Sequence, residues 1–204
     1  MKNMKRMLTS LLLAMAVLPA MQAQVSIKDP NITFFGLDFS KSKMLGTDGF
    51  SNPGDIVGRI FGEWNSLIVN EKDKYNVKYA FQKAEVNYDF SIVDKRNATV
   101  NANELVTNNS YSIDEKTVAG VIKNYSSKTK GLGVVLVVEK FDKTEEKASV
   151  FVTYFDIGAK KVLLTERVTA APVGFGFRNY WAGAIAKILK ECHNKTAGWE
   201  AASK

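Results

Sequence analysis

Apolar and polar residues alternate along this chain with two different periods, which predict where its strands and helices lie. A period of two indicates a strand, and apolar positions three and four residues apart indicate a helix. Five strands are expected, at 32–39, 85–93, 134–138, 148–155 and 162–169. Three helices are expected, at about 53–68, 113–125 and 179–191.

The expected strands differ in the burial that their patterns predict. Between 85 and 93 alternate residues are apolar, namely Val86, Tyr88, Phe90 and Ile92. This is the pattern of a half-buried strand. The run from Val134 to Val138 is apolar at every position, as in a strand covered on both faces. Short turns join this run to the next two strands, so the last three strands are expected to form an antiparallel meander.

Capping residues indicate where two of the helices begin. Asn52 is expected to cap the first helix, with Pro53 at its first position. Ser112 and Glu115 have the spacing of a capping box at the start of the second helix. The last helix is expected to give way to a frayed polar tail from about 194.

The remaining segments are polar, and the element order that results predicts the fold class. Loops are expected over 40–54 and 94–111, and 75–83 is open between a short helix and a loop. The order is then β-α-β-α-β-β-β-α. It predicts an α/β (α+β) fold in which helices pack on a mixed sheet of about five strands. Residues 24–204 show no internal repeat and are expected to form a single domain.

The first 23 residues have the three parts of a secretory signal peptide. A basic start is followed by an apolar run from Leu11 to Leu18 and by a short segment that closes with the small residue Ala23. The run is too short to span a bilayer, which takes roughly 20 apolar residues. We expect cleavage near Ala23 and a periplasmic or secreted protein. No cysteine ends the signal and no later apolar run is long enough, so neither a lipid anchor nor a membrane span is expected.

The charge of the chain changes when the signal is set aside. The whole chain has 28 basic and 21 acidic residues, a formal net charge of +7. The signal holds three of the basic residues and none of the acidic ones, so 25 basic and 21 acidic residues leave +4. These charges are mixed along the chain, without the basic patch that is typical of nucleic-acid binders. A mixed solvated surface is expected, and no nucleic-acid partner.

Few residues are suited to catalysis or metal binding. Cys192 is the only cysteine and His193 the only histidine. Helical neighbours point about 100° apart, which disfavours a catalytic dyad, and a zinc site needs three or four ligands. We therefore expect no metal and no other cofactor. Cys192 is interpreted as a buried residue of the last helix.

Two acidic residues lie at strand ends. Asp38 is near the C-terminal end of the first strand, where α/β folds bind ligands. Asp156 ends the second strand of the meander. The sequence identifies no partner for either, so both are candidate ligand or contact residues and no catalytic residue is assigned.

The densest group of glycines and aromatic residues precedes the last helix. Its candidate contact residues are Gly174, Phe175, Gly176, Phe177, Arg178 and Trp181. Glycines, a helix start and an arginine together would suit an anion. The alternative is structural, with glycines that let the chain turn and rings that fill the core. Any rings left exposed would make this group a contact surface.

Parts of this pattern resemble a known group of proteins. The resemblance is carried by the strand at 32–39 with its Ser- and Lys-rich loop, by 150–156, by 160–164, and by Gly-Phe-Gly-Phe-Arg-Asn-Tyr-Trp at 174–181. These segments resemble uncharacterised secreted proteins of Bacteroidetes, over most of residues 30–192. The resemblance implies export and an α/β domain, and no known activity.

A remoter likeness lies in the strand-turn-strand around Phe155-Asp156-Ile157-Gly158. It is to the amino-terminal domain of TolB-type periplasmic proteins and to the curli-secretion protein CsgG. CsgG-like proteins are lipoproteins, whereas this chain lacks the cysteine that would carry the lipid.

Three functional hypotheses follow from these observations. The first is a non-catalytic exported envelope protein that binds a protein or an envelope component. The second is an exported carboxylate-dependent hydrolase that uses Asp38 or Asp156, in which two carboxyl groups would lie about 5 to 9.5 Å apart. The third is a homo-oligomeric assembly unit joined through the rings from Phe175 to Trp181. Convergence of Asp38, Asp156 and Arg178 in one pocket would favour an enzyme or a small-ligand site.

Overall fold

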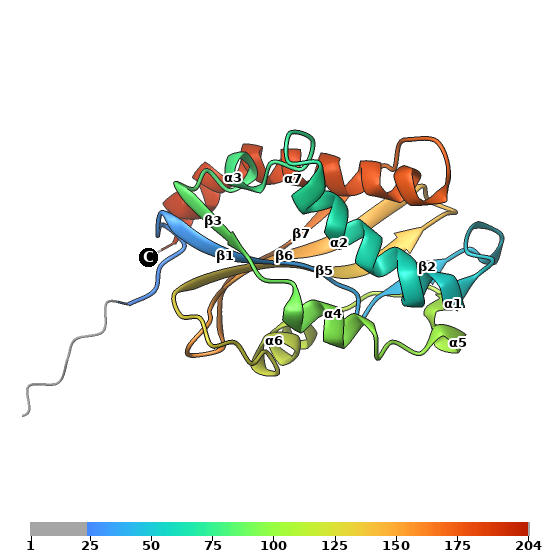
Figure 1. Cartoon of the computed structure of the whole chain (residues 1–204), viewed down its shortest axis with the longest axis horizontal. Helices are drawn as coiled ribbons and strands as arrows, with labels where there is room; N and C mark the ends of the chain where they lie inside the picture. Colours follow the sequence, from blue (N-terminus) through green and yellow to red (C-terminus); the bar gives the residue numbers. More distant parts are fainter. Residues whose placement is uncertain (1–23, 204) are drawn as a thin grey trace, which may run out of the picture.

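A mixed seven-stranded sheet runs through the middle of the molecule, and helices cover both of its faces (Figure 1). The structure is a computed structural model that describes residues 24–203. The predicted signal peptide at 1–23 lies outside these residues. The predicted α/β class with a mixed sheet is confirmed.

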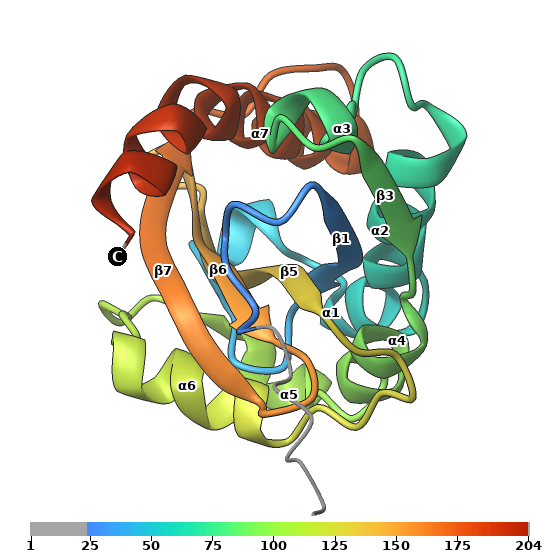
Figure 2. The same cartoon turned by 90° about the vertical axis from the view of Figure 1, so that its left-hand side faces the viewer.

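The sheet combines parallel and antiparallel strands. β1 (Asn31–Asp38) lies between β3 (Glu85–Tyr88) and β5 (Leu132–Asp142) and pairs in parallel with both. β5, β6 (Lys147–Asp156) and β7 (Lys161–Ala170) form the predicted antiparallel meander. Figure 2 shows the strands in the order β7, β6, β5, β1 and β3 across the sheet.

Two short strands extend the sheet where loops are predicted. β2 (Lys43–Leu45) pairs with residues 140–142 of β5, beyond the part of β5 that pairs with β1. β4 (Val106–Thr107) pairs with β2, as β3 does with β1. β2 and β4 thus lie beyond the ends of β1 and β3, so that the sheet is five strands wide, in agreement with the predicted number. The predicted loops are wrong at these strands, because two or three residues are too few to show a period.

The first predicted helix is confirmed as three consecutive segments. α1 (Pro53–Asp55), η2 (Ile56–Ile60) and α2 (Phe61–Asn70) follow one another without a break, and η2 has π-helical geometry. Asn52 caps the start as predicted, because its Oδ1 accepts a hydrogen bond from the Asp55 amide at 3.2 Å.

Only the first part of the predicted strand at 85–93 forms a strand, namely β3. Asp89 ends it, since its Oδ1 accepts hydrogen bonds from the amide and the hydroxyl of Ser91 at 3.1 and 2.6 Å. The short helices α4 (Ser91–Asn97) and α5 (Ala102–Leu105) follow, so the predicted loop is wrong here too. Local side-chain bonds of this kind turn the chain without changing its apolar pattern.

The second predicted helix is present with a different cap. α6 (Glu115–Lys123) begins after Asp114, whose Oδ1 accepts a hydrogen bond from the Thr117 amide at 2.7 Å. The predicted capping box with Ser112 is wrong. An aspartate two residues later provides the same type of cap and satisfies the free amides of the first turn.

The last helix is longer than its apolar stripe predicts. α7 (Phe177–Ala202) includes the segment for which a frayed tail from about 194 is predicted, and that prediction is wrong. Thr196 and Trp199 are buried on it. The hydroxyl of Thr196 donates a hydrogen bond to the backbone of α3 (Val77–Ala80) at 3.1 Å. The end of the helix is therefore held against α3 and the core.

Each face of the sheet carries its own core. α2, α3 and α7 lie over one face, and α4, α5 and α6 lie over the other (Figure 1). Under α7 the ring of Phe141 stacks on Trp181 at 4.8 Å and meets Trp64 edge-on at 5.2 Å. The smaller core beneath α6 contains Phe35, Val118, Ile122, Val135 and Phe155.

Two buried asparagines complete the edge of β1 beyond the end of β3. The Leu37 amide donates to Asn65 Oδ1 at 2.7 Å, and the Phe39 amide donates to Asn97 Oδ1 at 2.7 Å. The Leu37 carbonyl accepts from Asn97 Nδ2 at 2.9 Å. Gly36 has a φ of +87°, and a Cβ there would lie 2.6 Å from Asn65 Oδ1. Helix side chains thus replace the missing strand, because buried backbone groups need partners.

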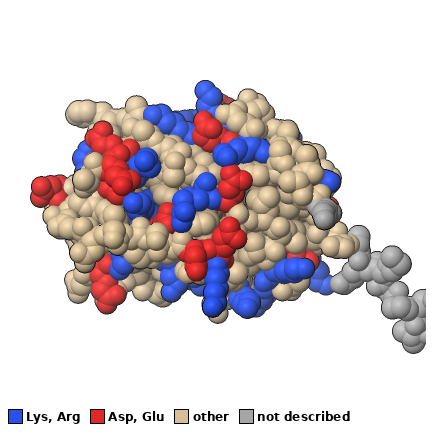
Figure 3. Space-filling view, turned by 180° about the vertical axis from the view of Figure 1, so that it is seen from behind, with Lys and Arg blue, Asp and Glu red and all other residues tan. Residues whose placement is uncertain are grey.

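The outer surface shows no concentration of one charge on the face seen in Figure 3, where acidic and basic side chains are interspersed. This agrees with the mixed charge pattern of the sequence. Within residues 24–203, none of the helices is long and apolar enough to cross a membrane.

Candidate functional site

The segment between β7 and α7, residues 171–176, is held against α7 and is called the 171–176 loop. The Val173 amide donates a hydrogen bond to the Tyr180 carbonyl at 3.1 Å. Gly183 allows this contact, since a Cβ at that position would lie 1.9 Å from the Val173 carbonyl oxygen. Gly174 has a φ of +137°, which favours glycine. The backbone of the loop therefore has a fixed position.

The aromatic residues of this segment separate into buried and exposed rings. Trp181 is buried, and Phe177 is half-buried beside Phe50 and Trp64, with ring centroids 5.8 and 6.0 Å apart. Phe175 is 95% exposed. The structural interpretation thus fits Phe177 and Trp181, whereas Phe175 projects into solvent.

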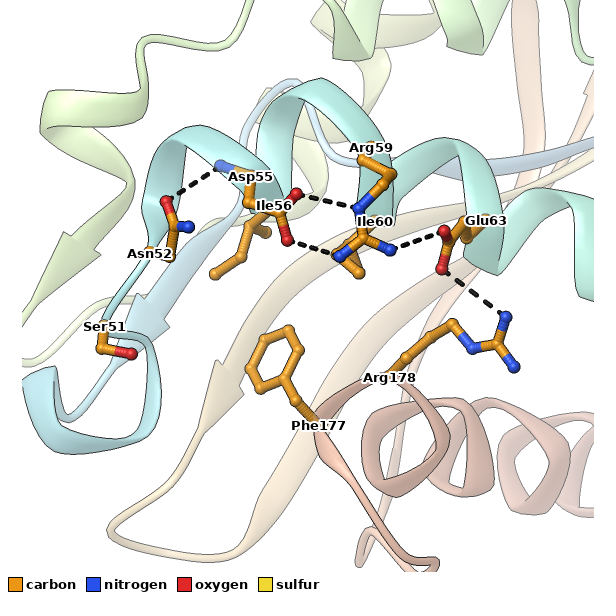
Figure 4. Close-up of a pocket in the computed structure, with 9 residues that line it drawn as sticks. All are labelled: Ser51, Asn52, Asp55, Ile56, Arg59, Ile60, Glu63, Phe177 and Arg178. Carbon is orange, nitrogen blue, oxygen red and sulfur yellow. Dashed lines mark hydrogen bonds and ion pairs between the residues drawn. The ribbon is translucent and has the colours of Figure 1, made fainter.

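A groove of about 430 Å³ lies between the continuous helical segments α1, η2 and α2 on one side and the start of α7 on the other (Figure 4). Ile56 and Ile60, both from η2, point toward Phe177, and the three side chains form the apolar floor of the groove. π-helical segments are rare and are often found at functional sites. The sequence does not reveal this one, because its apolar spacing is that of an ordinary helix.

Four charged side chains on the groove pair with one another. Arg59 bonds Asp55 and Glu63, each at 2.6 Å, and Arg178 Nη1 lies 3.6 Å from Glu63 Oε2. The Arg59 guanidinium lowers the pKa of the Asp55 carboxyl. Glu63 Oε2 is buried and receives no hydrogen bond from the described residues. A ligand in this groove would therefore meet an apolar floor inside a charge-balanced rim whose side chains are already paired.

Asp38 lies in a buried network on the other side of the sheet. Its Oδ2 accepts hydrogen bonds from Arg96 Nε and from the Tyr125 hydroxyl, both at 2.8 Å. Its Oδ1 accepts from the Ser40 amide at 2.8 Å. Burial, and then the charge of Asp38, raise the pKa of Tyr125 well above its usual range. Asp38 thus ties the end of β1 to α4 and to the segment after α6.

Asp156 lies far from Asp38. It occupies the turn after β6, where its Oδ1 accepts a hydrogen bond from the Ala159 amide at 2.9 Å. In the sheet, Asp156 pairs with Leu132 of β5, whereas Asp38 pairs with Val137, five residues further along β5. Five residues of a strand span roughly 17 Å. The two acids therefore cannot act as one pair.

Arg178 lies apart from both acids, at the start of α7. Asp38, Asp156 and Arg178 do not converge in one pocket, since Arg178 belongs to the groove of Figure 4 and the acids make the contacts given above. Arg96 and Tyr125, which partner Asp38, are not among the residues predicted from the sequence. No motif marks them, because their contacts join segments 58 and 87 residues apart.

Cys192 and His193 have separate surroundings. Cys192 is buried as predicted, and burial raises the pKa of its thiol. The ring of His193 stacks on Tyr79 at 3.7 Å, and its Nδ1 lies 2.8 Å from the Tyr79 carbonyl. In the part of the chain that the structure describes, no three His, Cys, Asp or Glu side chains form a group that could hold a metal ion.

Comparison of the chain with protein-family models and with curated proteins finds no match. The resemblance to secreted Bacteroidetes proteins and the remoter likeness to TolB-type domains and CsgG therefore stay predictions. The geometry described above is the basis for assigning a function.

Proposed function

We propose that this chain is a non-catalytic exported protein of the bacterial envelope that binds a protein or another envelope component through the 171–176 loop. The observation that carries the proposal is the ring of Phe175, which is 95% exposed. A ring exposed to this extent contributes little to the stability of the fold, and aromatic residues, Phe among them, are enriched at protein contact surfaces.

The groove of Figure 4 supports the same proposal. It has an apolar floor, and its rim of Asp55, Arg59, Glu63 and Arg178 is already paired. An apolar centre with a polar rim is the usual composition of a protein interface. A partner that covers Phe175 would also reach this groove, since Phe177 and Arg178 follow directly in the chain.

The chemistry of the candidate residues supports binding rather than catalysis. A carboxylate-dependent hydrolase that uses two acidic residues needs one carboxylic acid that keeps its proton near neutral pH. The pKa of Asp55 is lowered by Arg59, and Asp38 and Asp156 are far apart. A nucleophilic cysteine needs a low pKa and access to solvent, whereas Cys192 is buried with a raised pKa.

Comparing what two tagged proteins retain from the envelope tests this proposal. The wild-type protein and its Phe175→Ser variant are purified from the producing cell under mild conditions, with Lys128→Ser as the matched control on another exposed loop. We expect a component that is retained by the wild type and by the control and is lost from Phe175→Ser, at an unchanged melting temperature. Equal retention by all three proteins would contradict the proposal.

A further inference from the structure

The exposed large apolar side chains of the described residues gather on one side of the molecule. They are Tyr79, Val173 and Phe175, which are 55, 52 and 95% exposed. Figures 1 and 2 both show α3, α7 and the 171–176 loop at the top of the molecule. The segments that carry the three exposed side chains therefore lie on one side of the molecule.

A second groove, of about 500 Å³, lies on this side and is called the lysine-rimmed groove. It is lined by Val173 and Tyr79 and by Gly183, Ala186 and Leu189 of α7. The groove is separate from the one in Figure 4, and the 171–176 loop lies between them. Phe175 does not line it.

Lysines line the groove, and few acidic side chains offset their positive charge. Lys74, Lys187 and Lys190 line it, against one acid, Asp73. Lys74 lies 3.8 Å from Glu71, whereas Lys187 and Lys190 form no ion pair with any residue from 24 to 203. The two are three positions apart on α7, so they lie on one helix face. The partner that suits this rim is negatively charged.

Resting on the proposed function, we infer that this side of the molecule docks on an anionic lipid bilayer, with Phe175 and Val173 entering the headgroup region and the lysines binding lipid phosphates. Peripheral binding of this kind combines buried apolar area with attraction to anionic lipids. A peptide in the groove would leave Phe175 uncovered, whereas a flat bilayer reaches Phe175, Val173 and Tyr79 together. The Gly174 and Gly183 contacts give the inserting loop its fixed position.

Vesicle flotation tests this inference. The protein without residues 1–23 is used, since all of the helices, strands and core residues described above lie in 24–203. Vesicles of equal parts phosphatidylglycerol and phosphatidylethanolamine are compared with phosphatidylcholine vesicles. We expect binding to the anionic vesicles that is at least about tenfold tighter, and that weakens as salt is raised.

Variants identify the side of the molecule that binds. Phe175→Ser is expected to weaken binding to the anionic vesicles by about tenfold, and Lys187→Glu with Lys190→Glu by at least as much. The matched control is Lys116→Glu with Lys123→Glu, the same charge change on exposed positions of α6, across the sheet. This control is expected to lose much less, and circular dichroism checks that all variants fold.

Three results would overturn the inference. They are absence of binding to anionic vesicles, equal binding to both kinds of vesicle, and an equal loss in the α6 control. If vesicle binding is absent while Phe175→Ser still loses a protein that the wild type retains, the proposed function stands and the partner of this surface is an acidic protein. If Phe175→Ser changes neither measurement, the proposed function fails as well.

Discussion

Single residues decide how the 171–176 loop meets α7. Gly183 is buried beneath Val173, and a glycine in a helix is an unfavourable choice unless another chain passes close to it. The sequence singles out Gly174 and Gly176 because they belong to the dense group of glycines and aromatic residues before the last helix. It misses Gly183 because glycine within a helix carries no pattern. The candidate segment was therefore predictable, and the contact that fixes it was not.

Gly183→Ala is predicted to displace the loop. The added Cβ would lie 1.9 Å from the Val173 carbonyl oxygen, so the hydrogen bond from the Val173 amide to Tyr180 should break. Hydrogen exchange at the Val173 amide should become faster, and the protein should unfold at a lower temperature. The control is Gly198→Ala, where a Cβ meets nothing within 4 Å and helix propensity predicts a gain of up to about 1 kcal/mol. Unchanged exchange in Gly183→Ala would contradict the prediction.

Asp38→Ala is predicted to destabilise the protein by about 3 kcal/mol, because it leaves Arg96 and Tyr125 without their buried partner. Asp156→Ala removes one exposed hydrogen bond and should cost about 1 kcal/mol or less. Urea unfolding measures both. Similar losses in the two variants would show that the network around Asp38 adds little stability.

At the scale of elements, the sequence predicts long regular segments well and short ones badly. The meander and the first helix are correct because each shows several periods of its pattern. β2, β4, α4 and α5 are missed because two to seven residues show none. The frayed tail is wrong because Trp199 is an isolated apolar residue in a polar segment, and its burial depends on β7 and not on its neighbours.

Asn97→Ala tests how the edge of β1 is completed. The variant removes two buried hydrogen bonds, to the Phe39 amide and the Leu37 carbonyl, and should cost about 2 kcal/mol in the free energy of unfolding. Asn124→Ala, on the exposed end of α6, loses one bond to Gly120 and should cost about 0.5 kcal/mol. Equal effects in urea unfolding would refute this role of Asn97.

The contact between α7 and β7 predicts a pH dependence. Burial raises the pKa of Glu166, but hydrogen bonds from Lys195, at 2.7 Å, and from Trp199 outweigh burial and lower it below its ordinary 4.5. A lowered folded-state pKa contributes stability above pH 4.5 that is lost as the pH falls through the folded value. Lys195→Met should therefore lose less stability than the wild type between pH 6 and pH 3. The difference should be about 0.5 kcal/mol, because the carboxyl is partly exposed. If the stability of Lys195→Met changes with pH in the same way as that of the wild type, the prediction is contradicted.

At the scale of the whole molecule, the proposed function requires that the protein is exported, because the proposed partner lies in the envelope. If residues 1–23 are a signal, the protein outside the cytoplasm should begin at Gln24. Mass spectrometry of periplasmic and secreted fractions measures this directly. Detection of the protein only in the cytoplasm, with Met1 in place, would contradict the proposed localisation and leave the fold unaffected.

The two faces of the sheet differ in the role that we assign to them. Beneath α6, the charged groups described are buried in internal networks such as that of Asp38. Over α7, apolar side chains and lysines reach solvent around a loop of fixed position. This asymmetry explains why Asp38 is a poor candidate for a site and why the 171–176 loop is the better one.

The central claim is that Phe175 contacts a partner in the cell, and site-specific photo-crosslinking tests it most directly. A photoreactive amino acid is placed at position 175 in one strain and at position 128 in another, and both strains are irradiated. The account predicts a discrete adduct with protein or lipid from position 175 and none from position 128. No adduct from position 175, or the same adducts from both positions, would contradict it.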